Sequence, residues 1–253
     1  MPLIAVASPK GGVGKTTLAA NLAVSLQRLG RQVTAVDFDS QNALRFHLLP
    51  DGPATLGIAR CVAIGRSWRE TLQVGESGVR VAPYGDSTAA ERLHMKEALL
   101  EQPLAELLSE LLDSDDDILI ADTAPGEGRL QARLEGLADI NLVVLLADAG
   151  SMSLVPGFRD GLLLTPAHAG APETLAILNQ VDPRRRLSRD ISEFIAGHHG
   201  GRFVGAVHYD EALAEAAAHG KTVVEAAPES LAARDIRDIA SRLEARLRVS
   251  QEA

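Results

Sequence analysis

The segment SPKGGVGKTT, residues 8–17, holds the residues whose types and spacing point most directly to chemistry. Its glycines leave room for backbone N–H groups to turn toward a phosphate, because no Cβ stands in the way. Lys15 stands where a phosphate loop places the lysine that reaches the β- and γ-phosphates, and the Thr16 hydroxyl stands where Mg²⁺ is bound. The predicted phosphate-binding residues are Gly11, Gly12, Val13, Gly14, Lys15, Thr16 and Thr17.

The same loop departs from the common pattern G-x-x-x-x-G-K-[ST]. Pro9 occupies the position of the first glycine, and a second lysine, Lys10, precedes Lys15. A second cation near the phosphates would offset the charge that builds on them during phosphoryl transfer. We therefore predict a catalytic role for Lys10 beside Lys15, and the alternative is an ordinary solvated loop lysine.

Acidic residues follow two apolar segments further along the chain. Residues 36–44 read VDFDSQNAL and contain Asp37 and Asp39, and residues 118–126 read ILIADTAPG and contain Asp122. Ligands of α/β proteins bind at the carboxyl ends of parallel strands, which is where Asp122 would lie. A carboxylate can also accept a hydrogen bond from an attacking water. The alternatives are a strand-end cap for Asp37 and a helix N-cap for Asp39.

Strand and helix patterns that would position these residues alternate along the chain. Short apolar runs without polar alternation are typical of parallel strands covered on both faces. The predicted strands are residues 3–8, 32–37, 79–84, 117–122, 140–148, 174–180 and 202–207. The predicted helices are residues 17–29, 89–112, 128–137, 154–164, 187–196, 211–219 and 231–249. This order predicts one α/β domain over residues 1–253, of P-loop NTPase type, with a mostly parallel β-sheet and helices on both faces.

Composition and charge narrow the function classes. The chain is 46% hydrophobic and 23% charged, as in a globular protein, and its formal net charge is −9. This charge argues against a nucleic-acid binder, because such proteins are usually basic. Cys61 is the single cysteine, which excludes an internal disulfide and fits a reducing cytoplasm. We recognise no signal peptide and no apolar run of membrane-spanning length, so we expect a cytoplasmic protein.

The segment KGGVGKTT, residues 10–17, resembles the deviant phosphate loop of the ParA/MinD ATPases. The resemblance implies ATP and Mg²⁺ as ligands and a homodimer with nucleotide between its subunits. It implies that Lys10 crosses the dimer to touch the other subunit's phosphates, and that Asp39 orients the attacking water. Hydrolysis would be slow. The implied Mg²⁺-site residues are Thr16, Asp37 and Asp122.

The second acidic segment and a later strand end also resemble parts of this family's nucleotide site. The family's second switch commonly reads Asp-x-Pro-x-Gly, whereas this chain has Ala124 at the proline position and Gly126 in place. Residues 178–180, LNQ, resemble the segment whose asparagine reads the adenine. The resemblance therefore implies that Asn179 contacts the base.

The base-side loop and helix of the family resemble residues 207–223, VHYDEALAEAAAHGKTV. Val207 and His208 stand where the family often has Pro-Arg. His208 and Asp210 are therefore predicted to line the base pocket, and an ordinary surface or core histidine is the alternative for His208.

Several non-catalytic stretches resemble the cellulose-biosynthesis branch of the family, the BcsQ or YhjQ group. These stretches are residues 67–72, 81–85, 181–191, 208–216 and 227–236. The resemblance implies an ATPase that promotes assembly, localisation or regulation of the bacterial cellulose synthase secretion complex. It also implies BcsR- and BcsE-type partner subunits, and a place at the inner face of the membrane or the cell pole through that complex.

Two other branches of the family remain as alternatives. A partition ATPase would bind DNA as an ATP dimer, and the segment RRRLSR, residues 184–189, offers clustered cations for phosphate contacts. A membrane-cycling ATPase would end in a basic amphipathic helix. The tail has an apolar stripe with arginines beside it, but packing of a last helix on the sheet explains that stripe more simply. The stripe consists of Ile236, Ile239, Leu243 and Leu247. A metabolic kinase is a third class, and no acceptor-site motif is apparent.

Overall fold

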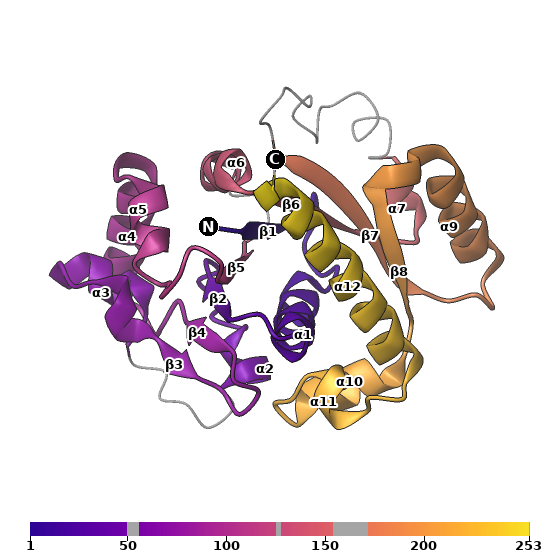
Figure 1. Ribbon diagram of the computed structural model, residues 1–253, viewed down its shortest axis with the longest axis horizontal. Coiled ribbons are helices and arrows are strands. Elements are labelled where there is room, and N and C mark those ends of the chain that lie inside the picture. The colour runs from indigo at the N-terminus through magenta and orange to yellow at the C-terminus, as the bar shows by residue number, and fades with distance from the viewer. Residues whose placement is uncertain (50–55, 125–127, 154–171, 253) are drawn as a thin grey trace.

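Runs of Val, Ile, Leu and Ala form the strands at the centre of the molecule (Figure 1). The computed structural model describes residues 1–49, 56–124, 128–153 and 172–252. The strands there are β1 (Leu3–Ala7), β2 (Val33–Asp37), β3 (Gln73–Val74), β4 (Arg80–Ala82), β5 (Ile118–Asp122), β6 (Ile140–Leu146), β7 (Glu173–Val181) and β8 (Phe203–His208). They form one sheet in the order β3-β4-β2-β5-β1-β6-β7-β8. All neighbouring strands pair in parallel except β3 and β4, so the predicted mostly parallel α/β sheet is confirmed.

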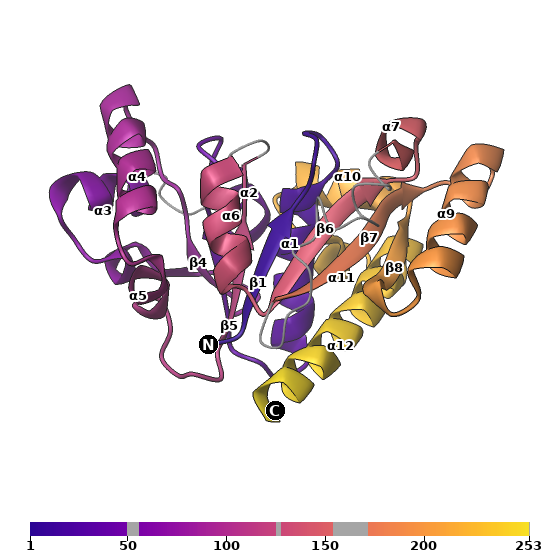
Figure 2. The same cartoon turned by 90° about the horizontal axis from the view of Figure 1, so that it is seen from above.

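Helices cover both faces of this sheet (Figure 2). Those on one face are α1 (Lys15–Arg28), α10 (Glu211–Ala218), α11 (Val223–Ala226) and α12 (Leu231–Glu252). Those on the other are α3 (Ile58–Ile64), α4 (Ala89–Glu101), α5 (Leu104–Ser109), α6 (Gly128–Leu137) and α9 (Arg186–His199). Strand side chains alternate between the two faces. Thus Ile4 and Val6 of β1 face α1, while Leu3 and Ala5 pack with the second group of helices.

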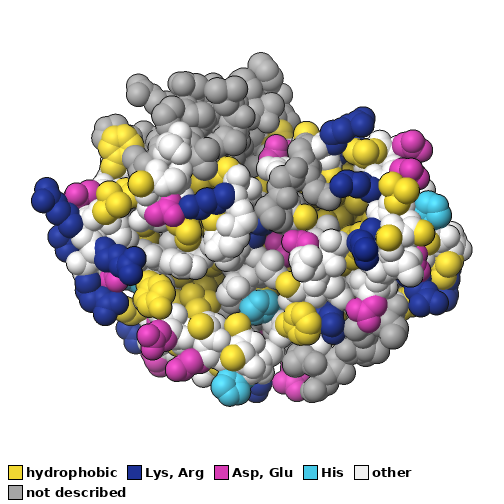
Figure 3. All heavy atoms as spheres, turned by 180° about the vertical axis from the view of Figure 1, so that it is seen from behind, with side chains coloured by type: hydrophobic (Ala, Val, Ile, Leu, Met, Phe, Trp, Pro, Cys, Tyr) yellow, Lys and Arg dark blue, Asp and Glu magenta, His cyan; other side chains and the backbone are white. Residues whose placement is uncertain are grey.

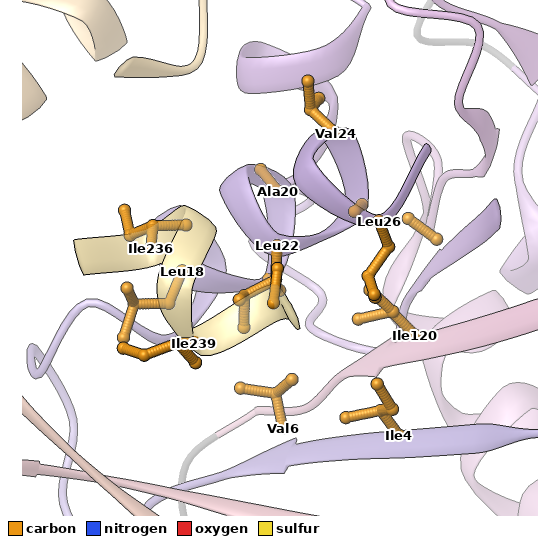
Figure 4. Packing of buried hydrophobic residues seen from close by; sticks show 14 of the residues in the cluster. Ile4, Val6, Leu18, Ala20, Leu22, Val24, Leu26, Ile120, Ile236 and Ile239 are labelled. Atoms are coloured by element: carbon orange, nitrogen blue, oxygen red, sulfur yellow. The ribbon is translucent and has the colours of Figure 1, made fainter. Parts of the chain in front are cut away.

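The apolar stripe of the last helix is buried on the sheet. Figure 4 shows Ile236 and Ile239 of α12 beside Leu18 and Leu22 of α1, above Val6 of β1. Leu243 and Leu247 continue the stripe and are also buried. Full burial of such a side chain contributes about 1.5–3 kcal/mol. Packing of a last helix on the sheet therefore accounts for the stripe, and among the described residues no helix is long and apolar enough to cross a membrane.

The helix predicted over residues 89–112 is two helices in the structure, α4 and α5. Pro103 has no backbone N–H to continue the helical hydrogen bonds, and it disfavours helical backbone at the residue before it. Gln102 is accordingly extended, with φ −79° and ψ 160°. The freed Leu99 carbonyl accepts a hydrogen bond from Arg133 of α6 instead.

Several short elements were not predicted. They are α2 (Arg45–Leu48), α3, α7 (Ala149–Met152), α11, strand β3 and the 3₁₀ turns Trp68–Thr71 and Gly200–Arg202. Most span only one turn, which is too short for an apolar period to be read from the sequence. The helix predicted over residues 154–164 lies outside the described residues.

Candidate nucleotide-binding site

The phosphate loop connects β1 to α1 at the centre of the sheet, as predicted. Gly12 and Gly14 have positive φ angles of 75° and 89°, which favour glycine. A Cβ at Gly14 would lie only 2.5 Å from Nδ2 of Asn179. The loop and the carboxyl end of β7 therefore approach so closely that only glycine fits between them.

Lys15 is buried at the start of α1, where it faces acidic neighbours. Its Nζ donates a hydrogen bond of 3.1 Å to Oγ of Ser8, at the end of β1. Burial lowers the pKa of Lys15, and the negative charges of Asp122 and Asp39 oppose that shift. Lys15 is thus a desolvated cation placed between the loop and two switch carboxylates. The sequence analysis missed Ser8, whose polar hydroxyl at a strand end was the available signal.

Asp37 and Asp122 end the neighbouring strands β2 and β5 and lie opposite each other in the parallel register. Both are fully buried. The carboxylate of Asp37 accepts backbone hydrogen bonds from Asp39 at 2.8 Å and from Leu44 at 3.0 Å. Burial raises the pKa of Asp37 well above its usual range and the charge of Asp122 adds to the rise, while these two bonds oppose it. Asp37 therefore fixes the path of residues 38–44.

Asp122 differs from Asp37 because neither of its oxygens receives a hydrogen bond of ordinary geometry from the described residues. Burial raises its pKa to about 7, although the nearby Thr16 hydroxyl and the charge of Lys15 act in the opposite direction. A buried carboxylate without donors is costly unless a cation satisfies it. Oxygen donors of this kind suit Mg²⁺, so Asp122 and Thr16 fit the predicted metal site.

The part of the chain that the structure describes holds no group of three or more His, Cys, Asp and Glu that could bind a metal by themselves. Mg²⁺ is commonly held by one or two carboxylates together with substrate phosphates and water. The arrangement of Thr16, Asp37 and Asp122 is of that kind, with Asp37 supporting the loop rather than offering free oxygens.

Asp39 lies partly exposed after β2, close enough to Lys15 to oppose the shift of its pKa. Its Oδ1 accepts a hydrogen bond of 2.9 Å from the backbone of Gln41, which makes a local turn. The next helix, α2, begins only at Arg45, so Asp39 does not serve as its N-cap. The second switch residues Pro125 and Gly126 lie outside the described residues.

Lys10 is held on the opposite side of the loop from this acidic cluster. Its Nζ forms an ion pair of 2.6 Å with Oδ2 of Asp148, and the two side chains are 33% and 43% exposed. Asp148 also caps α7 by accepting from the backbone of Ser151 at 2.7 Å. Burial alone would raise the pKa of Asp148, but its hydrogen bonds with Lys10 and Ser151 lower it. The sequence analysis missed Asp148, although it is the last residue of a predicted strand.

A pocket of about 240 Å³ opens beside the phosphate loop and includes the predicted base-side residues. Its lining comes from the loop and the start of α1, the end of β7, the end of β8 with the segment after it, and α10. The lining residues are Gly14, Thr17, Asn179, Gln180, His208, Tyr209, Asp210, Glu211, Leu213, Ala214 and Ala217. The structure therefore brings Asn179, His208 and Asp210 together, as the sequence analysis predicted, and it adds Tyr209, whose exposed ring no motif had marked.

Two of the predicted base-side residues, Asn179 and Asp210, have different hydrogen-bond partners. Nδ2 of Asn179 donates to the carbonyl of Val13 at 2.8 Å. Asp210 caps α10 through Ala212 at 3.0 Å and also accepts from Ala232 of α12 at 3.2 Å. Both oxygens of Asp210 thus hold helix ends, whereas Asn179 keeps its oxygen available.

Comparison with known proteins places this site in a family. The family model described as "Cellulose biosynthesis protein BcsQ" matches residues 1–243. The chain belongs to the BcsQ family of ParA/MinD-type ATPases. The family resemblance inferred from the phosphate loop and the later segments is therefore confirmed.

Individual relatives agree with this assignment. The chromosome-partitioning ATPase Soj of Thermus thermophilus is 30% identical over 96% of this chain and 96% of its own. The cellulose biosynthesis protein BcsQ of Salmonella typhimurium is 26% identical over 95% of this chain and 93% of its own. The solved structure of the cell division ATPase MinD of Pyrococcus furiosus superposes with a TM-score of 0.75 at 25% identity, covering 96% and 98% of the two chains. The MinD structure of Pyrococcus horikoshii, with the same TM-score at 22% identity, contains Mg-ADP.

The raised pKa of Asp122 predicts how the stability of the ligand-free protein depends on pH. Its folded pKa is about 7, whereas the unfolded carboxyl titrates near 4. Between these values the folded state binds more protons, so the free energy of unfolding falls as pH rises. At about pH 8, Asp122→Asn should melt at least about 2 °C above the wild type, and the difference should shrink at about pH 5.

Thermal melts without MgATP measure the pH dependence of the free protein, and melts with MgATP measure the contribution of Asp122 to ligand binding. MgATP should raise the melting temperature of the wild type more than that of Asp122→Asn, because the variant lacks the carboxylate. Asp86→Asn, at an exposed turn, serves as the control and should melt like the wild type. Equal melting temperatures of Asp122→Asn and wild type at both pH values would show that Asp122 carries no buried charge penalty.

Proposed function

We propose that this chain binds ATP and Mg²⁺, dimerises with nucleotide between its subunits, and hydrolyses the nucleotide slowly. The observation that carries the proposal is that the two lysines of the phosphate loop lie in different environments. Lys15 is buried beside Asp122 and Asp39, whereas Lys10 lies partly exposed and is paired with Asp148. Lys15 is thus placed to serve the phosphates of its own subunit. Lys10 can turn toward a second subunit once its exposed ion pair with Asp148 opens.

The residues of the loop and switches have separate tasks in this proposal. Backbone N–H groups of the loop and the start of α1 bind the phosphates. Thr16 and Asp122 would hold Mg²⁺, which would neutralise charge that develops on the phosphates. Asp39 orients the attacking water by accepting its hydrogen bond. Asp37 keeps Asp39 in place through its hydrogen bond to the backbone of that residue.

We further propose that the dimer supports assembly, localisation or regulation of a bacterial cellulose synthase secretion complex. The support is the family match over residues 1–243 and the relatives that are named cellulose biosynthesis protein BcsQ. Subunits of BcsR and BcsE type are the proposed partners. The chain would then act in the cytoplasm, at the inner face of the membrane or the cell pole.

A partition function is the second candidate, because Soj is a relative and an arginine cluster is exposed. Arg184, Arg185 and Arg186 begin the α9 region with side chains at least 81% exposed. Figure 3 shows Lys and Arg side chains gathered at its left edge, the end of the molecule that α9 occupies. Asp182 and Asp190 lie within ion-pair distance of these arginines and offset part of their charge. An acidic protein partner therefore suits this cluster better than DNA.

Removal of Lys10 tests the sandwich dimer. With saturating ATP and Mg²⁺, the wild type should elute from gel filtration as a dimer and Lys10→Ala as a monomer, because the trans contact to phosphate is lost. Asp148→Asn removes the same ion pair but leaves the lysine, so it should still dimerise. An exposed pair of this kind contributes about 0–1 kcal/mol, so both variants should fold. The trans role is wrong if Lys10→Ala dimerises as well as the wild type.

Replacement of Asp39 tests the hydrolysis step. Asp39→Ala and Asp39→Asn should bind ATP with unchanged affinity and release phosphate on the order of 10²-fold more slowly, because the water loses its acceptor. The asparagine variant can still accept from Gln41, so it separates loss of charge from distortion of the loop. Phosphate release at the wild-type rate by either variant would remove Asp39 from the mechanism.

Capture of partners tests the cellulose assignment. The full chain, immobilised with ATP and Mg²⁺, is exposed to native cytoplasm in which DNA has been digested, with Lys10→Ala as the matched bait. ATP-dependent recovery of cellulose synthase subunits by the wild type alone is the expected result. Recovery of a centromere-binding protein in their place would favour the partition function.

A further inference from the structure

His208 lies at the end of β8, where it both lines the nucleotide pocket and contacts the last helix. Oδ2 of Asp235, on α12, lies 2.9 Å from the backbone nitrogen of His208 and 2.7 Å from its ring Nδ1. Two contacts to one carboxylate oxygen fix both the backbone and the ring of His208. This pair belongs to none of the phosphate, metal or switch roles described above.

The contact with Asp235 decides which ring nitrogen of His208 carries hydrogen. An ionised carboxylate can only accept hydrogen bonds, so Nδ1 must be the protonated nitrogen. In the neutral ring Nε2 then keeps its lone pair. Nε2 is the nitrogen that remains for the pocket, and there it is a hydrogen-bond acceptor.

Asn179 offers a second acceptor in the same pocket by the same logic. Its Nδ2 must be the end that donates to the carbonyl of Val13. Its Oδ1 is buried and receives no hydrogen bond from the described residues. A buried acceptor without a donor is unfavourable, so a ligand that brings N–H groups is preferred here.

We propose that His208, held by Asp235, selects adenine over guanine by accepting a hydrogen bond from the exocyclic amine of the base. Adenine has an amine at C6, with two N–H groups for Nε2 of His208 and Oδ1 of Asn179. Guanine has a carbonyl oxygen at that position and would set a lone pair against both acceptors. The ring of Tyr209, 52% exposed and part of the same lining, provides a surface on which the base stacks. The inference rests on the proposed ATP-binding function and adds which groups choose the base.

Asp235 is a positioning residue in this account, and Asp235→Asn is its sharpest test. One oxygen of Asp235 makes both contacts, and an asparagine oxygen in its place can also accept both, but without charge. The hydrogen is then held less firmly on Nδ1, and a ring that carries it on Nε2 becomes a donor toward the pocket, which favours the guanine carbonyl. A purely structural role of Asp235 would weaken all nucleotides together and leave their ratio unchanged.

The experiment measures equilibrium affinities of the full chain for ATP, GTP and purine riboside triphosphate, which lacks the 6-amine, all with Mg²⁺. The wild type should bind ATP about tenfold or more tightly than either analogue, since a buried acceptor is left unpaired by both. Asp235→Asn should lower the ATP-to-GTP preference about tenfold or more. His208→Phe fills similar space without an acceptor and should lose most of the preference. It serves as the second variant should Asp235→Asn fold poorly.

His219→Gln is the matched control. This histidine lies at the end of α10, outside the nucleotide pocket, and its Nδ1 contacts the carbonyl of Glu215. Its ATP-to-GTP ratio should equal that of the wild type. Equal wild-type binding of ATP and GTP, or an unchanged ratio in His208→Phe, would overturn the inference and leave the ATP-dependent dimer standing. A wild-type chain that binds no nucleotide would overturn both.

Discussion

Two carboxylates buried side by side at the carboxyl ends of neighbouring strands are the constraint on which this site depends. Parallel pairing of β2 with β5 sets Asp37 directly against Asp122, away from water. Burial and mutual repulsion both disfavour their charged forms. The fold compensates Asp37 with two backbone N–H groups and leaves Asp122 to the Thr16 hydroxyl and the charge of Lys15. This end of the sheet therefore gains stability when a cation binds, which couples ligand binding to an unfavourable feature of the free protein.

The phosphate loop and the base pocket are held in fixed relation by hydrogen bonds between distant segments. Asn179 of β7 donates to Val13 in the loop, while Asn21 of α1 accepts from the backbone of Val223 at the start of α11. Arg28 of α1 donates to the carbonyl of Val224 in the same turn. Since α10 lies between the pocket and α11, these bonds tie the base side to the phosphate side. A nucleotide spans two groups of elements that already lie at a set distance.

Much of this arrangement was predictable from the sequence because it depends on local rules. A strand, closely spaced glycines and a helix define the phosphate loop, and carboxylates at strand ends must meet at one edge of a parallel sheet. Pairings between distant segments were not predictable. Nothing local to Lys10 indicates that Asp148 lies 2.6 Å away, and nothing local to His208 indicates Asp235. The prediction of one helix over residues 89–112 was wrong although Pro103 was a local signal against it. The structure shows that the effect of this proline outweighs the apolar period around it.

The acidic turn before β5 shows why charge patterns alone mislead. An acidic run such as residues 113–117 suggests a solvated turn, and residues 113–116 are exposed. Asp117 is instead buried, where it pairs with Arg80 of β4 at 2.6 Å and accepts from the backbone of Asp113 and Ser114. The charge that pairs with Arg80 of β4 thus comes from within a run that looks merely soluble. At the other end of β5, Asp122 receives no such hydrogen bonds from the described residues, and that difference separates a structural carboxylate from one available to a ligand.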